Sequence, residues 1–224
     1  VTMKLWEGPE GEMPETGCCT ASDSEDARKV ASKLDIPYYV LDYTESFSKN
    51  VVDNFIDMYA QGLTPNPCVE CNRSVKFDHF LNQAKKLNCE KVATGHYAKI
   101  IKNENFYELH KADYLDKDQS YVLHMLKSDD LENILFPLGE ITKPEVRQIA
   151  ARLGLKTAFK KDSQDICFVG KKDYRSFVEK RIDLTSAGEI FDVNGNKVGN
   201  HNGIHEFTVG QRKGLPGGQA TPRY

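Results

Sequence analysis

The sequence predicts an α/β fold in which helices cover a parallel sheet, followed by a small β-rich domain. The first observation is an alternation of apolar strands and amphipathic helices over residues 1–98, the order expected of a parallel sheet with crossover helices. The second is a change after Gly170 to short strands separated by turns. The third is the composition of the 224 residues, 39% hydrophobic and 28% charged, which is typical of a folded globular protein.

The first part of the chain contains three predicted strands and three predicted helices. Strands are expected at 1–5, 36–42 and 91–97, and helices from Ser24 onward, over 51–62 and over 75–87. Asp23 is the expected N-cap of the first helix, and Gly62 is the expected stop of the second. In parallel sheets ligands gather beyond the carboxyl ends of the strands, and the segment "TGHY" lies at one such end.

The later part of the chain changes from helices to short strands. The segment 98–111 alternates about a polar turn and predicts a hairpin, and short helices are expected within 116–126 and 128–136. "TKPEVRQIAARLGL" predicts a helix with Thr142 at the N-cap, Glu145 completing a capping box and Gly154 at the end. We therefore expect two domains: residues 1–165 form the α/β domain with a helical part, and residues 166–224 form an incomplete β-rich domain.

The bulk properties restrict the protein class. A formal charge of −3 argues against a general electrostatic attraction to nucleic acid, although local lysine pairs remain. No apolar run reaches the roughly 20 residues of a membrane helix, and the sequence shows no charged-then-apolar leader pattern, so we expect a cytoplasmic protein without a membrane partner. In that compartment six cysteines favour a metal or catalytic role over disulfides. The chain starts and ends within apparent structural elements, which predicts truncation at both ends.

Two cysteine segments could carry chemistry. In "TPNPCVECN" the pair Cys68 and Cys71 has the spacing of a redox centre, half of a zinc site or iron–sulfur ligands. A zinc ribbon needs a second pair of this kind, which the sequence lacks, and the redox interpretation fits the context only in part. Cys167, between Ile166 and Phe168, is by itself typical of a buried strand cysteine.

Six segments together are far more specific than either cysteine motif. They are "GLTPNPCVECNRSVKFDHFL", "ATGHYA", "DKDQSYVL", "FPLGEITKPEVRQIAARLGL", "KKDSQDICFVG" and "FTVGQRKGL". In this order and at these separations they closely resemble the bacterial tRNA-specific 2-thiouridylases, the MnmA family, over essentially the whole chain. The resemblance implies an adenine nucleotide alpha hydrolase-like domain of the PP-loop type. It also implies that the family's N-terminal "SGGxDSS" pyrophosphate loop and its C-terminal barrel are missing.

The resemblance implies a reaction and a set of site residues. ATP with Mg²⁺ activates C2 of the wobble uridine of tRNA as an adenylate, and a persulfide on Cys167 delivers sulfur with Cys71 as partner nucleophile. The sulfur comes from a sulfur-relay protein or a cysteine desulfurase. The other implied contacts are Met3 and Gly95 to the adenosine, Asn66, Pro67 and Cys68 to the target base, and His96, Lys117, Asp118 and Gln119 to tRNA. The reaction requires the base outside its stack, which costs a few kcal/mol.

Two other interpretations remain open at this point. Some relatives have Asp at the position where this chain has Cys68. This chain therefore has one more thiol than those relatives, and Cys68, Cys71 and Cys167 could together hold an iron–sulfur cluster. The missing pyrophosphate loop is instead compatible with a catalytically inactive relative that only binds tRNA.

Overall fold

Parallel strand pairs form the α/β part of the protein, as predicted. The computed structural model describes residues 1–8, 20–160, 166–169, 173–182, 186–211 and 213–216. The parallel pairs are β1 (Thr2–Lys4) with β2 (Val40–Asp42), and β3 (Val92–Ala93) with β6 (Ile134–Leu135). Within these ranges the two pairs do not hydrogen-bond to each other. The strand predicted at 36–42 starts later, because the backbone N–H of Ile36 bonds to the carbonyl of Ala31 at the end of the preceding helix.

Helix α1 (Ala21–Lys33) begins earlier than the sequence pattern predicts. Thr20, and not Asp23, is its N-cap: the Thr20 hydroxyl accepts the backbone N–H of Asp23 at 3.0 Å. The Asp23 carboxylate in turn accepts the backbone N–H of Thr20 at 3.0 Å. This reciprocal capping box satisfies two otherwise unpaired donors, so the prediction of Asp23 as the cap was wrong by three residues.

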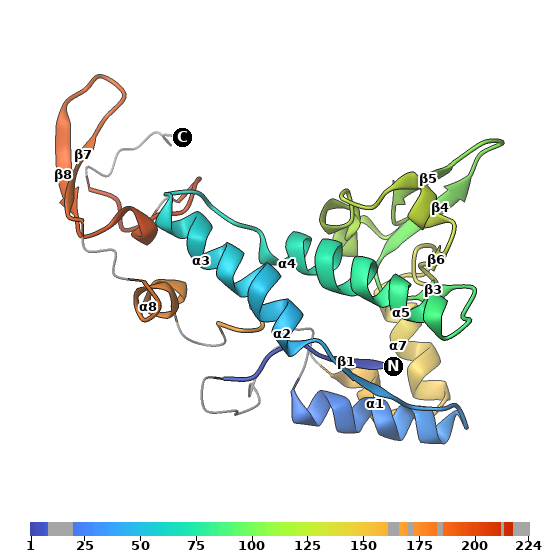
Figure 1. Ribbon diagram of the computed structural model, residues 1–224. Coiled ribbons are helices and arrows are strands. Elements are labelled where there is room, and N and C mark those ends of the chain that lie inside the picture. Colours follow the sequence, from blue (N-terminus) through green and yellow to red (C-terminus); the bar gives the residue numbers. More distant parts are fainter. Residues whose placement is uncertain (9–19, 161–165, 170–172, 183–185, 212, 217–224) are drawn as a thin grey trace.

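Two long helical segments cross the middle of the molecule (Figure 1). The first consists of α2 (Thr44–Phe47), the π-helical segment η1 (Ser48–Val52) and α3 (Asp53–Ala60). The second consists of α4 (Pro67–Glu70), the π-helical segment η2 (Cys71–His79) and α5 (Phe80–Lys86). The two π-helical segments contact each other. The first ends near Gly62, whose φ of 72° is accessible to glycine at little cost, as predicted.

The second long helical segment corrects the prediction of a helix over 75–87. It begins at Pro67 because the Asn66 side chain caps it, accepting the backbone N–H groups of Cys68 at 3.1 Å and Val69 at 3.3 Å. Pro67 occupies the first helical position, where a missing N–H costs nothing. Both cysteines of the Cys-x-x-Cys pair therefore lie on a helix and not in a loop before one.

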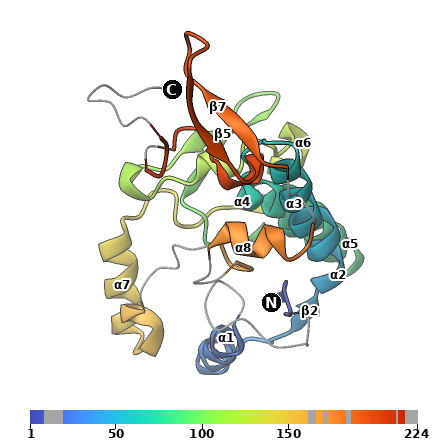
Figure 2. The ribbon, with the colours of Figure 1, turned by 90° about the vertical axis from the view of Figure 1, so that its left-hand side faces the viewer.

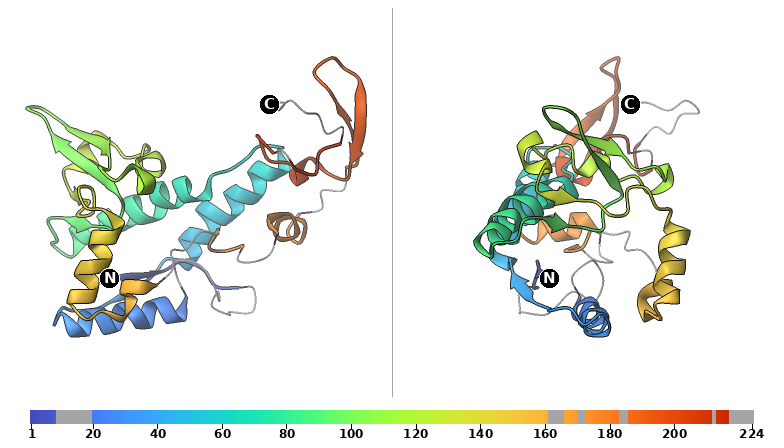
Figure 3. Two further views of the ribbon diagram at one scale, coloured as in Figure 1. Left: turned by 180° about the vertical axis from the view of Figure 1, so that it is seen from behind. Right: turned by 90° about the vertical axis from the view of Figure 1, so that its right-hand side faces the viewer.

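The hairpin of the middle segment follows the prediction, whereas the short helix predicted over 128–136 ends at Leu131 and is followed by strand β6. The elements of this segment are β4 (Ala98–Lys102), β5 (Tyr107–Lys111), the 3₁₀ turns η3 (Leu115–Lys117) and η4 (Ser120–Val122), and α6 (Ser128–Leu131). Helix α7 (Lys143–Arg152) has the predicted capping box between Thr142 and Glu145. In Figure 3 the C-terminal end of α7 (yellow) approaches the C-terminal end of α1 (blue), where Lys33 donates to the carbonyl of Gly154 at 2.8 Å.

The C-terminal part contains the predicted short strands, which pair as an antiparallel hairpin. Its elements are the 3₁₀ turn η5 (Lys156–Phe159), α8 (Tyr174–Glu179), β7 (Gly188–Phe191), β8 (Lys197–His201) and η6 (Ile204–Glu206). Figure 2 shows the hairpin β7–β8 at the opposite end of the molecule from α1. Helix α8 is an element that the sequence pattern did not predict.

Two clusters of buried side chains form the core. The first core cluster consists of Leu5, Phe47, Val51, Val52, Phe55, Ile56, Tyr59, Cys71, Val75, Phe168, Val169 and Val178. The second core cluster consists of Phe77, Leu81, Ala84, Val92, Ala98, Val122, Leu123 and Ile134. Segment η2 contributes to both clusters, so the helix that carries the cysteine pair is fixed on two sides. Among the residues that the structure describes, no helix is long and apolar enough to span a membrane.

Candidate active site

The two cysteines of the Cys-x-x-Cys pair lie in different surroundings. Cys68 is exposed on the first turn of α4. Cys71, at the start of η2, is only 7% exposed and belongs to the first core cluster. Cys71 shares the buried face of the helix with Val75, one turn further along. Segments of π-helix occur often at functional sites, and Cys71 is the first residue of this one.

Cys167 lies in a turn, which corrects the prediction of a buried strand cysteine. The backbone N–H of Val169 bonds back to the carbonyl of Ile166 at 3.1 Å and closes the turn. Phe168 and Val169 are the buried residues of this turn, and the Phe168 ring centroid lies 5.2 Å from that of Phe55 and 5.7 Å from that of Phe47. The Cys167 side chain is half-buried and packs against the first core cluster. The motif residues 161–165 lie outside the described part of the chain.

The fold thus brings Cys71 and Cys167 to one core cluster from distant parts of the sequence. Cys71 is a member of the cluster and Cys167 packs against it, whereas Cys68 does neither. Over the residues described, no three His, Cys, Asp or Glu side chains are grouped as metal ligands. The arrangement therefore gives no support to an iron–sulfur cluster on the three cysteines. A cavity of about 540 Å³ lies elsewhere, between the hairpin β4–β5 and β6, and neither Cys71 nor Cys167 lines it.

The two residues expected around an adenosine belong to different strand pairs. Met3 lies on β1 and packs against the first core cluster. Gly95 is exposed just after the carboxyl end of β3. A Cβ added at Gly95 would have one neighbour within 4 Å, the Leu138 side chain at 3.9 Å. The protein therefore leaves space beside Gly95, where a ligand can approach the backbone closely.

His96 is enclosed by aromatic rings and is only 9% exposed. Its ring lies 5.9 Å from those of Phe77 and Phe136, and its Nδ1 is 2.8 Å from the Thr94 hydroxyl. Burial, with a smaller effect from the charge of Lys76, lowers the pKa of His96 from 6.5 to about 4. The imidazole is therefore neutral at pH 7 and binds any partner as a hydrogen-bonding group, not as a cation.

The buried neutral His96 leads to a prediction about stability and pH. An unfolded histidine takes up a proton near pH 6.5, whereas His96 in the folded protein stays neutral down to about pH 4. Its contribution is thus fully present above pH 6.5 and is lost as the pH falls toward 4. We expect the free energy of unfolding to fall by about 2 kcal/mol more between pH 7 and pH 4.5 in the wild type than in His96→Asn.

Urea titrations at the two pH values measure this difference. The exposed residue His124 provides the matched control, and His124→Asn is expected to retain the wild-type pH dependence. Equal pH dependence in the wild type and His96→Asn would contradict the prediction.

Two of the three residues in the segment Lys117–Gln119 have side chains that brace the fold. Asp118 accepts the backbone N–H of Ala112 at 2.8 Å and the Ser120 hydroxyl at 2.7 Å. Gln119 accepts the backbone N–H of Tyr97 at 3.0 Å through its Oε1, and donates its own N–H to the Tyr97 carbonyl at 2.8 Å. These bonds hold the segment beside His96, its neighbour in the predicted site.

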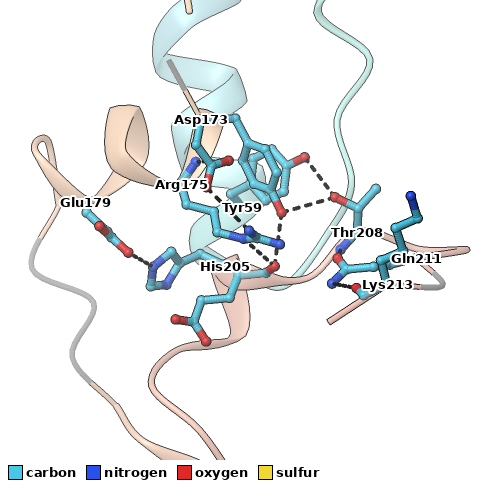
Figure 4. A network of polar contacts seen from close by, with 10 residues as sticks. Tyr59, Asp173, Arg175, Glu179, His205, Thr208, Gln211 and Lys213 are labelled. Carbon is cyan, nitrogen blue, oxygen red and sulfur yellow. Dashed lines mark hydrogen bonds and ion pairs between the residues drawn. The ribbon is translucent and has the colours of Figure 1, made fainter. Parts of the chain in front are cut away.

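A polar network that the sequence did not reveal joins the C-terminal part to α3 (Figure 4). The Tyr59 and Tyr174 rings stack at 4.6 Å, and Thr208 lies within hydrogen-bonding distance of both phenol groups, at 3.3 and 3.2 Å. The backbone N–H of Val209 donates to the Thr64 hydroxyl at 2.9 Å, two residues before the Asn66 cap. The motif "FTVGQRKGL" therefore lies next to the start of α4, although its Arg212 is outside the described residues.

His205 belongs to the same region, and no motif in the sequence points to it. It is 4% exposed, and its Nε2 lies 3.2 Å from the Glu179 carboxylate. A single sequence contains no signal for such pairs, because the partners come from α8 and η6 and meet only in the folded chain.

Comparison with known families assigns both parts of the chain. A family described as the tRNA methyl transferase HUP domain matches residues 1–171, and one described as the tRNA methyl transferase PRC-barrel domain matches residues 175–224. The chain belongs to this family. The two matches confirm the predicted order of a PP-loop-type α/β domain followed by a small β-rich domain.

Several curated relatives of this chain are named tRNA-specific 2-thiouridylase MnmA. The protein of Chloroflexus aurantiacus is 48% identical over 228 residues, which cover 100% of this chain and 63% of the relative. That of Clostridioides difficile is 48% identical over 218 residues, covering 96% of this chain and 60% of the relative. That of Rickettsia peacockii is 46% identical over 216 residues, covering 96% and 59%. The chain thus spans about three fifths of the length of these relatives.

Proposed function

We propose that the protein transfers sulfur to C2 of the wobble uridine of tRNA in an ATP-dependent reaction. The observation that carries the proposal is the approach of Cys71 and Cys167 to one core cluster, since two thiols are what a persulfide transfer with disulfide formation requires. The relatives named tRNA-specific 2-thiouridylase support the choice of substrate.

The proposed reaction has three steps that balance. First, uracil O2 attacks the α-phosphorus of ATP, pyrophosphate leaves and the N3 proton is lost, which gives an O2-adenylate. The terminal sulfur of a Cys167 persulfide then attacks C2, and AMP departs as a good leaving group. Finally, the Cys71 thiolate attacks the Cys167 sulfur, which forms a Cys71–Cys167 disulfide and releases 2-thiouridine. The sulfane sulfur gains two electrons, the two thiols lose them, and a cellular dithiol must reduce the disulfide before the next cycle.

The remaining roles follow the same proposal. Met3 and Gly95 contact the adenosine, and the space beside Gly95 suits close approach of a ligand. Asn66, Pro67 and Cys68 hold the flipped-out base, with Asn66 also fixing the first turn of α4. His96 and the segment 117–119 contact tRNA, in keeping with recognition of RNA through splayed bases and backbone rather than through a basic surface. ATP enters with Mg²⁺, and the persulfide sulfur comes from a cysteine desulfurase or a sulfur-relay protein.

The proposal is tested with the full-length protein, ATP, Mg²⁺, a cysteine desulfurase with cysteine as the persulfide source, a dithiol reductant, and a tRNA transcript with uridine at the wobble position. Nucleoside mass spectrometry is expected to show 2-thiouridine that depends on ATP. A matched transcript with cytidine at this position is expected to yield none. Absence of 2-thiouridine in the complete reaction, or its appearance at another uridine, would refute the proposed function.

A further inference from the structure

The Asn72 side chain presents a buried hydrogen-bond acceptor that the protein itself does not use. Asn72 is 3% exposed, and its Nδ2 donates to the carbonyl of Val122 at 3.3 Å. Its Oδ1 is fully enclosed and has no hydrogen-bond partner within the described residues. An unsatisfied buried acceptor is unfavourable, and such atoms are rare in folded proteins. This acceptor can therefore take a hydrogen bond from a ligand.

The orientation of this amide is determined by its neighbour. Turning the amide over would place Oδ1 against the Val122 carbonyl, so that two acceptors would face each other. The Nδ2 group must therefore point at Val122, and Oδ1 must point away from it. The acceptor is thus aimed and fixed in direction before any ligand binds.

Other polar side chains of the candidate site already use their acceptors inside the protein. Asn66 Oδ1 caps α4, Asp118 accepts from Ala112 and Ser120, and Gln119 Oε1 accepts from Tyr97. Asn72 Oδ1 differs from these three acceptors because it accepts no hydrogen bond from the described residues. A substrate group that donates a hydrogen bond is the partner that this atom lacks.

The position of Asn72 connects this acceptor with the proposed base site. Asn72 follows Cys71 directly and lies one helical turn after Cys68. Helical side chains lean toward the N-terminus of their helix, so the amide extends over the turn that carries Cys68. Segment η4, which supplies Val122, contacts α4 on this side. The acceptor therefore lies between the start of α4 and η4.

We infer that Asn72 Oδ1 accepts a hydrogen bond from N3–H of the uracil and so distinguishes uridine from cytidine at the target position. The inference rests on the proposed function and adds a specificity-determining residue to it. Uracil has a single ring donor, N3–H, whereas N3 of cytosine is an acceptor and would face Oδ1 unfavourably.

The test compares binding of two tRNA transcripts that differ only in uridine or cytidine at the wobble position. The full-length wild-type protein is expected to prefer the uridine transcript by about tenfold. Asn72→Leu is expected to bind both transcripts equally, while Asn72→Asp retains the preference. A neutral buried carboxyl can donate to Val122 and still offer an acceptor, so this variant provides the conservative rescue. Asn82→Leu, at an exposed asparagine on the same long helix, is the matched control.

Each outcome decides the inference. Loss of the preference in Asn72→Leu, with retention in Asn72→Asp and Asn82→Leu, supports it. A preference within twofold of the wild-type value in Asn72→Leu overturns it, as does a wild type that binds the two transcripts equally. Failure of the wild type to form 2-thiouridine despite a preference that depends on Asn72 refutes the proposed reaction and leaves the base contact in place. Thermal melting of each variant shows whether it is folded at the assay temperature.

Discussion

Replacing Cys167 by serine in the full-length protein is expected to lower the rate of 2-thiouridine formation by at least about a thousandfold. A hydroxyl cannot carry a persulfide, so no sulfur reaches the activated C2 atom. Cys71→Ser is expected to lower the rate to a similar extent for a different reason. The mixed disulfide between C2 sulfur and Cys167 can still form, but without the Cys71 thiolate it is not resolved. The assay is nucleoside mass spectrometry in a single turnover of the persulfidated protein without added dithiol, so that only Cys71 can resolve the mixed disulfide.

The same two variants separate the proposed roles. Cys71→Ser is expected to accumulate a covalent tRNA–protein adduct that a reducing agent releases, whereas Cys167→Ser forms none. Cys89→Ser is the matched control, because Cys89 is exposed and lies outside both core clusters, and it is expected to retain the wild-type rate. Undiminished 2-thiouridine formation in Cys167→Ser would end the persulfide proposal. Bound iron that disappears together with activity in Cys68→Ser would instead indicate the cluster alternative.

Local signals in the sequence predicted those elements whose ends are determined by nearby residues. Thr142 and Glu145 stand three residues apart, and their capping box marks the start of α7 as expected. Gly62 likewise ends the first long helical segment through its own positive φ. The start of α4 was not predicted, because the apolar residues recur at helical spacing only from Val75 onward. The N-cap of the helix is Asn66, nine residues earlier.

The candidate site was less predictable, because it depends on contacts between distant segments. Neither Cys71 nor Cys167 has flanking residues that indicate a shared core cluster, and only the resemblance to a family paired them. The exposure of the two helical cysteines differs because η2 packs on two clusters, which no single-sequence pattern contains. The same holds for Tyr59 and Thr208, which meet across the junction of the two domains. In the sequence, Asn72 is indistinguishable from an ordinary polar residue of a helix. Only the folded structure shows the hydrogen bond to Val122 that orients its amide.

Truncating Phe168 to alanine is expected to lower the free energy of unfolding by about 3–5 kcal/mol. Phe168 is 6% exposed, and its ring lies 5.3 Å from that of Phe177 and 6.1 Å from that of Trp6, in addition to its contacts with Phe47 and Phe55. Its removal leaves a cavity that these rigid aromatic neighbours fill only in part. Urea denaturation followed by circular dichroism measures the change. A loss below about 1 kcal/mol would show that the turn is not anchored through this ring.

The contrast with another phenylalanine makes the result specific. Phe159 is 78% exposed, so Phe159→Ala is expected to change the free energy of unfolding by less than about 0.5 kcal/mol. The two substitutions should also differ in sulfur transfer at a temperature where both variants remain folded. Phe168 holds the turn that carries Cys167 against the first core cluster, where Cys71 lies. Loosening this turn is expected to slow formation of the Cys71–Cys167 disulfide while leaving the affinity for tRNA unchanged. A weakened tRNA affinity with an unchanged rate of disulfide formation would instead place Phe168 in the RNA-binding surface.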